Sequence, residues 1–350
     1  MNDTMLAAVL HGKRDLRLEE RRRPELSPGM VLLRVHRVGI CGSDLHYFDH
    51  GRCGGFVPAN PFVLGHELTG TVAELASDST TLSVGTRVTV NPARVCGVCE
   101  YCRAGRGNLC GQTIMLGSAS TKPPTDGAMA EYVVIRADQC HELPDNVDDG
   151  LGAMIEPLAV VLHAMKQAGS VAGKRVLVTG GGPIGLLAAM TARAFGAAPV
   201  ALSDVVLSRR NNALSLAADA VLDPAAPDLA NRVRELTGDG FDLVFEASGA
   251  APALRQAFDL IRRGGTIVQI GTLSVDDLPL PANQIMAREI RFVGSFRYGD
   301  VFPEAIRLLV ARRIDLQPLI TCVLPLVNVG DAMSRALARD NTMKVQISVP

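Results

Sequence analysis

The chain has 350 residues, enough for two domains, and its 47% apolar and 20% charged residues are typical of a globular protein with sizeable cores. Its 35 basic and 36 acidic residues leave a net charge of −1, which gives no support to a nucleic-acid partner. No apolar run is long enough to span a membrane, and the N-terminus lacks the basic region of a signal peptide, so we expect a cytoplasmic protein.

The first part of the chain carries short β-like runs that are broken by glycine and proline. Residues 31–38, 70–75, 87–90 and 131–135 have the composition of half-buried strands, with turn sequences such as S-P-G between such runs. We therefore predict antiparallel strands that form a partly open barrel over residues 1–155.

From Lys174 the pattern changes to an alternation of strands and helices. A short buried strand at 174–180 is followed by a helix at 183–196, a strand at 199–204 and a helix at 208–218. Further strands are predicted at 220–223, 241–248, 264–271 and 290–295. Six such strands separated by helices indicate a parallel, doubly wound sheet with right-handed crossovers.

The last part of the chain reads as one more helix, at about 302–312, and a final strand, K-V-Q-I-S-V. We expect this tail to return to the first domain. The predicted domains are therefore 1–155 joined to 296–350, and 156–295 between them, in an α/β plus β fold.

A glycine-rich turn marks a dinucleotide site in the second domain. The motif G-x-G-x-x-G follows the predicted strand, opens the helix and precedes a second strand that ends in Asp204. Such glycines let a pyrophosphate approach the helix N-terminus, and Asp204 is placed to accept hydrogen bonds from ribose hydroxyls. The predicted cofactor-binding residues are Gly180, Gly182, Pro183, Ile184, Gly185, Asp204, Arg209, Gly271 and Ser295.

A carboxylate at Asp204 repels a 2′-phosphate, so we predict NAD over NADP, while the nearby Arg209 leaves NADP possible. The alternative is a buried glycine turn without a ligand, with Asp204 as a surface loop residue.

Four of the eight cysteines crowd between residues 96 and 110. Cys96, Cys99, Cys102 and Cys110 read C-x2-C-x2-C-x7-C, which suits a closed tetrahedral zinc site that pins a loop. An iron–sulfur cluster is one alternative, although bacterial ferredoxin motifs close with x3 and proline rather than x7. Redox-active or unpaired thiols are the other.

A second group of metal-ligating residues is open rather than closed. Cys41, Ser43 and His46 lie in G-I-C-G-S-D-L-H, and His66 and Glu67 lie in V-L-G-H-E. A thiolate, an imidazole and a carboxylate leave one position free on zinc, as in a catalytic site. Glu156 lies near the predicted domain junction, where a site between cofactor and substrate is expected.

With these motifs in order, the whole chain resembles the zinc-dependent medium-chain dehydrogenases/reductases. The resemblance rests on the two motifs above, the cysteine quartet, E-P-L-A-V and G-G-G-P-I-G. Within that superfamily the chain is most similar to the polyol branch of sorbitol, threonine and L-idonate 5-dehydrogenases. The nearest likeness is to the L-idonate 5-dehydrogenases, through L-H-Y-F-D-H-G-R, L-G-S-A, V-V-L-H-A, F-E-A-S-G and G-S-F-R-Y.

The resemblance implies a GroES-like catalytic domain, a Rossmann domain, two zinc ions per chain and a homotetramer. It implies that Cys41, His66 and Glu67 surround the catalytic zinc, with Glu156 as an alternative or outer ligand. Ser43 is expected to take the hydroxyl proton and His46 to pass it on. Asp44 is either a partner that orients His66 or a plain turn residue.

The implied reaction is NAD-dependent oxidation of a secondary hydroxyl on a sugar acid or polyol, with L-idonate to 5-keto-D-gluconate as the leading candidate. Sorbitol, xylitol or threonine oxidation is the alternative within the family. A zinc-free quinone reductase relative or a non-catalytic nucleotide-binding protein is the alternative from another class.

A sugar-acid carboxylate requires a cation near the pocket. Arg297 is the first candidate and Arg52 the second, with a polyol contact as the equal alternative for Arg297. Tyr47 and Phe48 either wall the pocket or pack. The segment 126–132 departs from the family, with alanine and methionine at 128 and 129 where glycine and an aromatic residue are usual.

Overall fold

The computed structural model describes residues 3–76, 81–273, 277–338 and 342–350. The chain forms two compact units. One comprises Met1–Glu156 and Phe302–Pro350, and the other Pro157–Val301. The first unit thus contains both ends of the chain.

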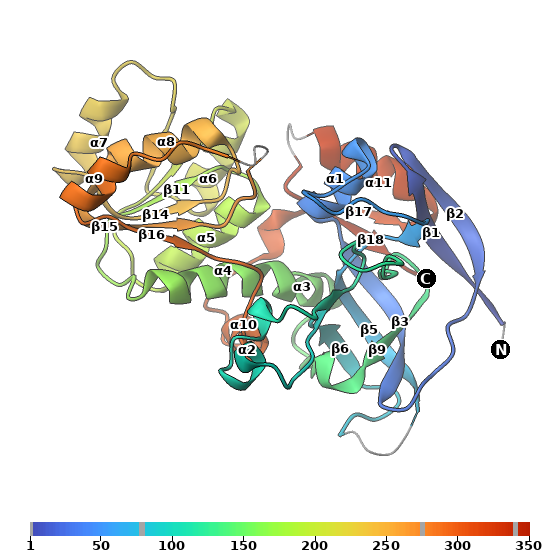
Figure 1. Ribbon diagram of the computed structural model, residues 1–350. Coiled ribbons are helices and arrows are strands. Elements are labelled where there is room, and N and C mark those ends of the chain that lie inside the picture. The colour runs from blue at the N-terminus through green and yellow to red at the C-terminus, as the bar shows by residue number, and fades with distance from the viewer. Residues whose placement is uncertain (1–2, 77–80, 274–276, 339–341) are drawn as a thin grey trace. The chain divides into compact units, whose positions relative to one another are not determined.

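A seven-stranded sheet is the main element of the first unit. Its order is β10-β6-β5-β3-β18-β17, with β9 also paired to β3. The strands are β3 (Met30–Gly39), β5 (Glu67–Leu75), β6 (Arg87–Val90), β9 (Tyr132–Arg136), β10 (Cys140–Glu142), β17 (Ile320–Pro325) and β18 (Lys344–Ser348). Strands β17 and β18, from the end of the chain, thereby share a sheet with β3 (Figure 1).

The pairing in this sheet is antiparallel as predicted, except for β17 and β18, which run parallel. The exception arises because α11 (Val329–Ala338) carries the chain back between these two strands. Close packing of β3 and β5 depends on Gly70, since a Cβ there would overlap the backbone carbonyl of Arg34.

A hairpin at the N-terminus was not among the predicted strands. Strands β1 (Thr4–Gly12) and β2 (Asp15–Arg22) pair antiparallel, and β4 (Phe62–Val63) adds to β1. Arg14 has φ 56° in the turn, a left-handed conformation that is uncommon outside glycine. The apolar residues of β1 enter the core of the first unit with Phe62 and Leu64.

The remaining elements of the first unit are short. Its helices are α1 (Gly42–His50), α2 (Glu100–Arg103), α3 (Asp149–Ala153), α10 (Phe302–Val310) and α11, and strands β7 (Ala93–Arg94) and β8 (Ile114–Met115) form a small ribbon. Single 3₁₀ turns occur at Gly107–Leu109, Ala137–Gln139, Gln317–Leu319 and Leu326–Asn328.

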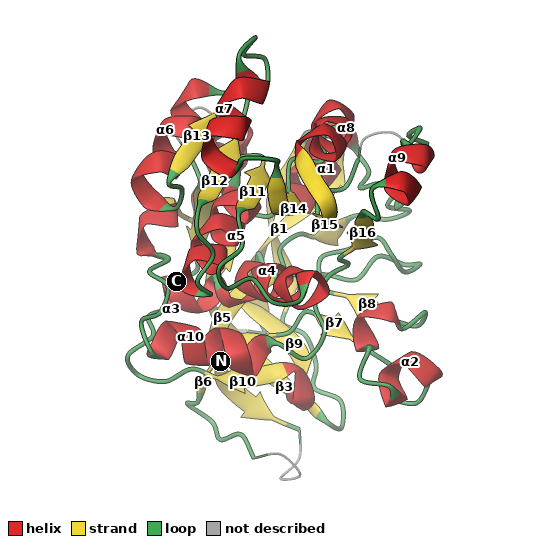
Figure 2. Cartoon of the chain, turned by 90° about the vertical axis from the view of Figure 1, so that its left-hand side faces the viewer, coloured by secondary structure: helices red, strands yellow, loops and turns green. Residues whose placement is uncertain are grey.

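The second unit is a six-stranded parallel sheet with the order β13-β12-β11-β14-β15-β16, flanked by helices (Figure 2). This is the doubly wound arrangement predicted from the sequence, and its chain order reverses between β11 and β14. The strands are β11 (Val176–Thr179), β12 (Val200–Ser203), β13 (Ala220–Leu222), β14 (Phe241–Glu246), β15 (Ile261–Gln269) and β16 (Arg291–Gly294). The helices are α4 (Ile155–Ala168), α5 (Pro183–Ala194), α6 (Leu207–Leu216), α7 (Leu229–Thr237), α8 (Ala251–Leu260) and α9 (Ala282–Ala287).

Local chemistry explains the first strand and helix of this unit. Every residue of β11 is buried, as expected for a central parallel strand covered on both faces. Helix α5 begins with Pro183, whose missing N–H costs nothing at a first helical position. It ends just before Gly196, which has φ 84°.

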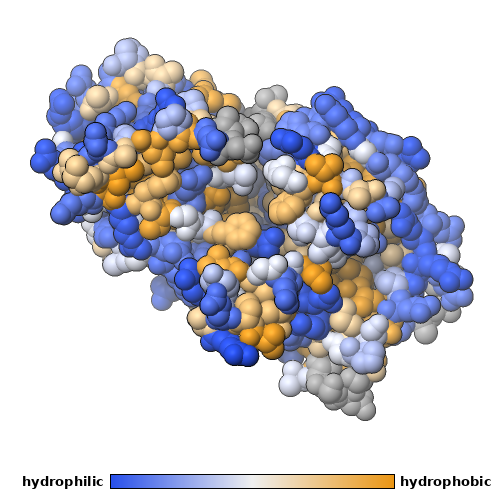
Figure 3. Space-filling model, in the orientation of Figure 1, coloured by the Kyte–Doolittle hydropathy of each residue, from blue (hydrophilic) through white to orange (hydrophobic). Residues whose placement is uncertain are grey.

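The surface mixes polar and apolar side chains. Over α8 and α9 both kinds are interspersed (Figure 3), and Leu280 and Met286 are among the exposed large apolar residues. Among the described residues, no helix has the length and apolar character needed to cross a membrane.

Candidate functional site

Three of the residues predicted to surround a catalytic metal come together in the first unit. Cys41 immediately precedes α1, His66 lies in the turn before β5, and Glu67 is the first residue of β5. Their ligand atoms all lie within 4.8 Å of one another. His66 and Glu67 are buried and Cys41 is partly exposed, so one side of the group is accessible.

Asp44 connects the two loops that carry these residues through hydrogen bonds to both of them. Its fully buried carboxylate accepts hydrogen bonds from the backbone N–H of Cys41 at 2.9 Å and of Gly65 at 3.2 Å. Its Oδ1 also lies 3.8 Å from Nδ1 of His66. Burial raises the pKa of Asp44, opposed by the attraction of His66. Asp44 is therefore a partner of the site rather than a plain turn residue.

The surroundings of His66 indicate whether a metal ion fits among these residues. Its buried Nδ1 has no hydrogen-bond partner among the described residues. Burial opposes charge on the ring, but Asp44 and Cys41 outweigh it and raise the pKa of His66 well above 6.5. An orphaned buried imidazole nitrogen beside a thiol and a carboxylate fits zinc, which prefers this set of ligands.

The carboxylate of Glu67 forms a buried ion pair with a lysine that no sequence motif singled out. Both oxygens of Glu67 accept hydrogen bonds from Nζ of Lys344 at 2.8 Å, and the carbonyl of Ile40 accepts a third at 3.2 Å. Burial disfavours the charge on Lys344, but the charges of Glu67 and Cys41 outweigh it and raise the pKa of Lys344. The available signal in the sequence was a lysine at the start of the predicted last strand, K-V-Q-I-S-V.

Glu156 also belongs to this environment. It is buried in the first turn of α4, and its charge contributes to raising the pKa of both His66 and Lys344. Two carboxylates therefore act on the same group of residues, as the sequence suggested without deciding between them.

The residues of the predicted proton relay lie on α1. Ser43 is partly buried in the first turn of the helix, and His46 follows it on the exposed side. Nδ1 of His46 faces Nδ1 of His50 at 3.2 Å, one helical turn further on. A path from the site through Ser43 and His46 would thus end at the solvent-exposed His50.

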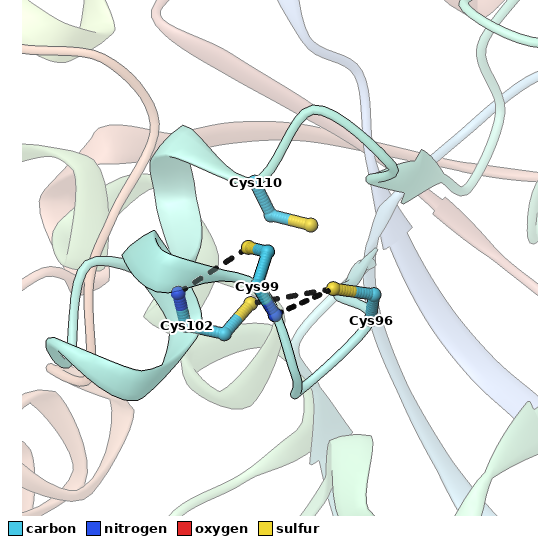
Figure 4. Close-up of side chains that lie close together, drawn as sticks. All are labelled: Cys96, Cys99, Cys102 and Cys110. Carbon is cyan, nitrogen blue, oxygen red and sulfur yellow. Dashed lines mark hydrogen bonds between the residues drawn. The ribbon is translucent and has the colours of Figure 1, made fainter.

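The cysteine quartet forms a second, separate group. All four sulfurs lie within 4.8 Å of one another and point inward from one loop (Figure 4). The Sγ atoms of Cys96 and Cys102 are 3.9 Å apart, close to the separation of about 3.8 Å that tetrahedral zinc–sulfur bonds produce. All eight cysteines are free, so disulfides do not explain the crowding.

The protonation of the quartet favours metal binding at two positions. A backbone N–H lowers the pKa of Cys96, and another lowers that of Cys110 to about 6. Burial and the neighbouring Cys99 raise the pKa of Cys102 to about 12. Because zinc binds thiolates rather than thiols, the lowered pKa values of Cys96 and Cys110 favour a metal ion at these two positions.

The predicted cofactor residues gather at the carboxyl ends of the parallel strands. Gly180 has φ 95° after β11, and a Cβ there would meet the backbone of Ser248 after β14. A Cβ at Gly185 would overlap the carbonyl of Gly180, so the turn and helix α5 pack closely only with glycine. A Cβ at Gly271, which follows β15, would overlap the backbone of Gly249. The hydroxyl of Ser295 is buried without a partner among the described residues.

Asp204 and Arg209 are neighbours at the next strand. The buried carboxylate of Asp204 accepts hydrogen bonds from the N–H groups of Gly181 and Val206, each at 2.7 Å, and lies 3.8 Å from Arg209. Asp204 is thus fixed beside the glycine turn rather than free on the surface. Glu246, which the sequence reading missed, caps the turn after β14 by accepting from the N–H of Ser248 and of Gly249.

The residues considered as substrate contacts, Arg297, Arg52 and Tyr47, lie in different environments. Arg297 has φ 52° and stacks on the ring of Phe296, with 4.8 Å from its guanidinium carbon to the ring centroid. Arg52 is exposed. Tyr47 is buried, and its hydroxyl accepts from the N–H of Ala119, so it packs rather than walls a pocket.

The departure at residues 128 and 129 also concerns packing. Ala128 and Met129 are both fully buried in the core of the first unit. A Cβ at Gly65 would come within 2.8 Å of Met129, so this side chain supports the turn that carries His66.

Comparisons with known proteins agree with the two-domain fold. The family of the alcohol dehydrogenase GroES-like domain matches residues 27–145, and the zinc-binding dehydrogenase family matches residues 183–311. Sorbitol dehydrogenase of Gallus gallus is 41% identical over 92% of this chain and 90% of its own length. A probable D-xylulose reductase A of Neosartorya fischeri is 41% identical over 91% of this chain and 89% of its own.

Among solved structures, L-idonate 5-dehydrogenase of Escherichia coli superposes with a TM-score of 0.92. It is 33% identical, and the match covers 99% of this chain and 98% of that one. Identity and coverage at this level establish common fold and family. The chain therefore belongs to the zinc-dependent medium-chain dehydrogenases/reductases, in their polyol branch, and its cofactors are zinc and a nicotinamide dinucleotide.

Proposed function

We propose that this protein oxidises a secondary hydroxyl of a polyol, with hydride transfer to NAD. The observation that carries the proposal is the group formed by Cys41, His66 and Glu67, in which the buried Nδ1 of His66 has no hydrogen-bond partner within the described part of the chain. Cys41 and His66 would hold the catalytic zinc, together with Glu67 or Glu156. When bound, zinc supplies a Lewis acid that lowers the pKa of a hydroxyl group.

The chain's own residues then have separate tasks. Asp44 fixes the loops of Cys41 and Gly65. Ser43 accepts the proton of the substrate hydroxyl, and His46 passes it to solvent. Replacing Ser43 with alanine is expected to lower kcat while zinc content and NAD affinity stay unchanged. An unaltered kcat would remove Ser43 from the relay.

We propose NAD rather than NADP as the preferred cofactor. The carboxylate of Asp204 is held beside the glycine turn by two N–H groups, where it would repel a 2′-phosphate. Arg209, 3.8 Å away, moderates this repulsion, so some activity with NADP is expected. The ratio of kcat/KM for the two cofactors tests the assignment, and a higher value for NADP would reverse it.

The quartet of Cys96, Cys99, Cys102 and Cys110 is proposed to hold a structural zinc. A closed set of four sulfurs leaves no position for substrate, so its task would be to hold the loop together. Replacing Cys99 with serine should lower the zinc content from two ions per chain to one, with NAD binding retained. Visible charge-transfer absorption of the isolated protein would instead indicate an iron–sulfur cluster.

The relatives with the higher sequence identity favour polyols over sugar acids as substrates. The two curated proteins at 41% identity are a sorbitol dehydrogenase and a probable D-xylulose reductase, whereas the L-idonate 5-dehydrogenase is 33% identical. L-Idonate oxidation to 5-keto-D-gluconate is the second candidate, on the strength of that structural neighbour and of Arg297, a cation for a carboxylate.

One panel separates the two candidates. Sorbitol, xylitol and L-idonate are compared with NAD at saturating zinc, and NADH formation is followed by its absorbance. Higher kcat/KM on sorbitol or xylitol supports the polyol assignment. Higher kcat/KM on L-idonate, lost in Arg297→Met, would establish the sugar acid instead. No turnover of any of the three would contradict both.

We further propose a homotetramer, which sedimentation velocity tests.

A further inference from the structure

Two histidines face each other at the C-terminal end of α1. His46 and His50 lie four positions apart, and both are exposed. Their Nδ1 atoms are 3.2 Å apart and their ring centroids 5.2 Å apart, so the two nitrogens lie between the rings. Histidines at positions i and i+4 of a helix share one face and can bind the same zinc ion. This pair is therefore a candidate site for a metal ion from solution.

The separation of the two nitrogens suits a single ion. Zinc–nitrogen bonds of about 2.0–2.1 Å at a tetrahedral angle place two ligand nitrogens about 3.3–3.4 Å apart. The observed distance between Nδ1 of His46 and Nδ1 of His50 is 3.2 Å, so both rings need to move only slightly to bind one ion. Because both side chains are exposed, water can occupy the two remaining positions of a tetrahedral ion.

A carboxylate beside His50 favours the tautomer that a metal needs. Oδ2 of Asp49 lies 3.5 Å from Nε2 of His50. Oδ1 of Asp49 accepts a hydrogen bond from Nε of Arg14 at 2.6 Å, which holds the carboxylate in place. A carboxylate near one ring nitrogen favours the proton on that nitrogen and leaves the lone pair of the other for a metal. In His50 that other nitrogen is Nδ1, which faces His46.

The end of the helix also favours a cation. Helix α1 ends at His50, and the N–H of Gly51 donates to the carbonyl of Tyr47 at 3.0 Å to close the last turn. The last carbonyl groups give the C-terminus of a helix a partial negative charge, which stabilises a positive charge placed there. An ion between His46 and His50 would lie beside this last turn.

We propose that His46 and His50 form a third metal site, which takes a divalent transition metal such as zinc or nickel from solution. Imidazole is a good ligand for both ions. The site is separate from the group of Cys41, His66 and Glu67 and from the cysteine quartet. With only two protein ligands it should fill at metal concentrations above those that saturate the other two sites.

One consequence of this site rests on the proposed function. A histidine in a proton relay accepts a proton at one ring nitrogen and releases it from the other. A metal ion on Nδ1 of His46 would occupy one of these nitrogens and block the path through Ser43. Excess zinc should therefore lower kcat as the third site fills.

The test is the number of zinc ions bound per chain, measured on the full chain by equilibrium dialysis at increasing free zinc. The unchanged protein should bind two zinc ions tightly and a third more weakly, whereas His50→Gln should stop at two. Asp49→Asn keeps both rings and should weaken binding of the third ion by about 10- to 100-fold. The matched control is His11→Gln, which alters a histidine of β1 that pairs with Glu19 and should leave all three ions bound.

Two results would overturn the proposal: a limit of two zinc ions in the unchanged protein at excess zinc, or a third zinc that persists in His50→Gln. NADH formation is followed in the same titration, and each variant is compared with its own rate at the lowest free zinc. A third zinc that binds without lowering kcat would support the metal site and refute the relay role of His46. Absence of turnover at every zinc concentration, with the expected binding, would refute the proposed function and leave the metal site standing.

Discussion

Replacing Gly39 with alanine would insert a methyl group into the space that the Glu67 carboxylate occupies. The added Cβ would overlap Oε2 of Glu67 and lie 3.2 Å from its Cβ and Cδ. The backbone of Gly39 is not in the left-handed region, so alanine itself is tolerated there. The change therefore acts on Glu67, which must leave Lys344.

The expected cost follows from the buried pair. Separating a buried ion pair typically costs about 3–5 kcal/mol. Alanine for glycine at a permitted backbone position returns about 0.4–1 kcal/mol through the unfolded chain. We therefore expect Gly39→Ala to lower the free energy of unfolding of the metal-free protein by about 2–5 kcal/mol.

Urea denaturation of the chelator-treated protein, followed by far-ultraviolet circular dichroism, measures this loss. Gly330→Ala is the matched control, because a Cβ there meets nothing within 4 Å and the residue lies in α11. The control should be as stable as the unchanged protein or slightly more so. Equal stability of Gly39→Ala and Gly330→Ala would contradict this prediction, since it would mean that the ion pair contributes nothing.

Two further changes test other parts of the first unit. A hydrogen bond from His36 and the nearby Arg87 hold the pKa of Asp149 at about 2, below its ordinary 3.8. Because the pKa of Asp149 is lower in the folded protein, this stabilisation is present above pH 3.8 and is lost as the pH falls toward 2. The free energy of unfolding of Asp149→Asn should therefore decrease less over that pH range than that of the unchanged protein. An equal decrease in the two proteins would contradict this prediction. Tyr47→Phe leaves the buried N–H of Ala119 without its acceptor and should cost about 1–3 kcal/mol in urea unfolding, whereas an unchanged midpoint would show that water replaces the hydroxyl.

The sequence was sufficient for much of the second unit because its signals are local. The glycine motif, the buried run before it and Asp204 all lie within 30 residues, and each has a physical reason to stand where it does. The N-terminal hairpin was missed because β1 reads as an apolar run and its turn, around Arg14, has none of the usual turn glycines in its centre.

The interaction of Lys344 with Glu67 was beyond the reach of local patterns. These residues are 277 positions apart and meet only because β18 returns to pair with β3. The same holds for Met129, which lies where the sequence departs from the family and which packs in the core behind Gly65. Such contacts depend on which strands are neighbours, and no spacing rule predicts that.

The most direct test of the account is the zinc content and turnover of Cys41→Ala, measured on the same preparation. We predict one zinc ion per chain instead of two, unchanged NAD binding and no detectable NADH formation from sorbitol or xylitol. Two zinc ions with near-normal turnover in this variant would contradict the assignment of the catalytic metal to the group of Cys41, His66 and Glu67.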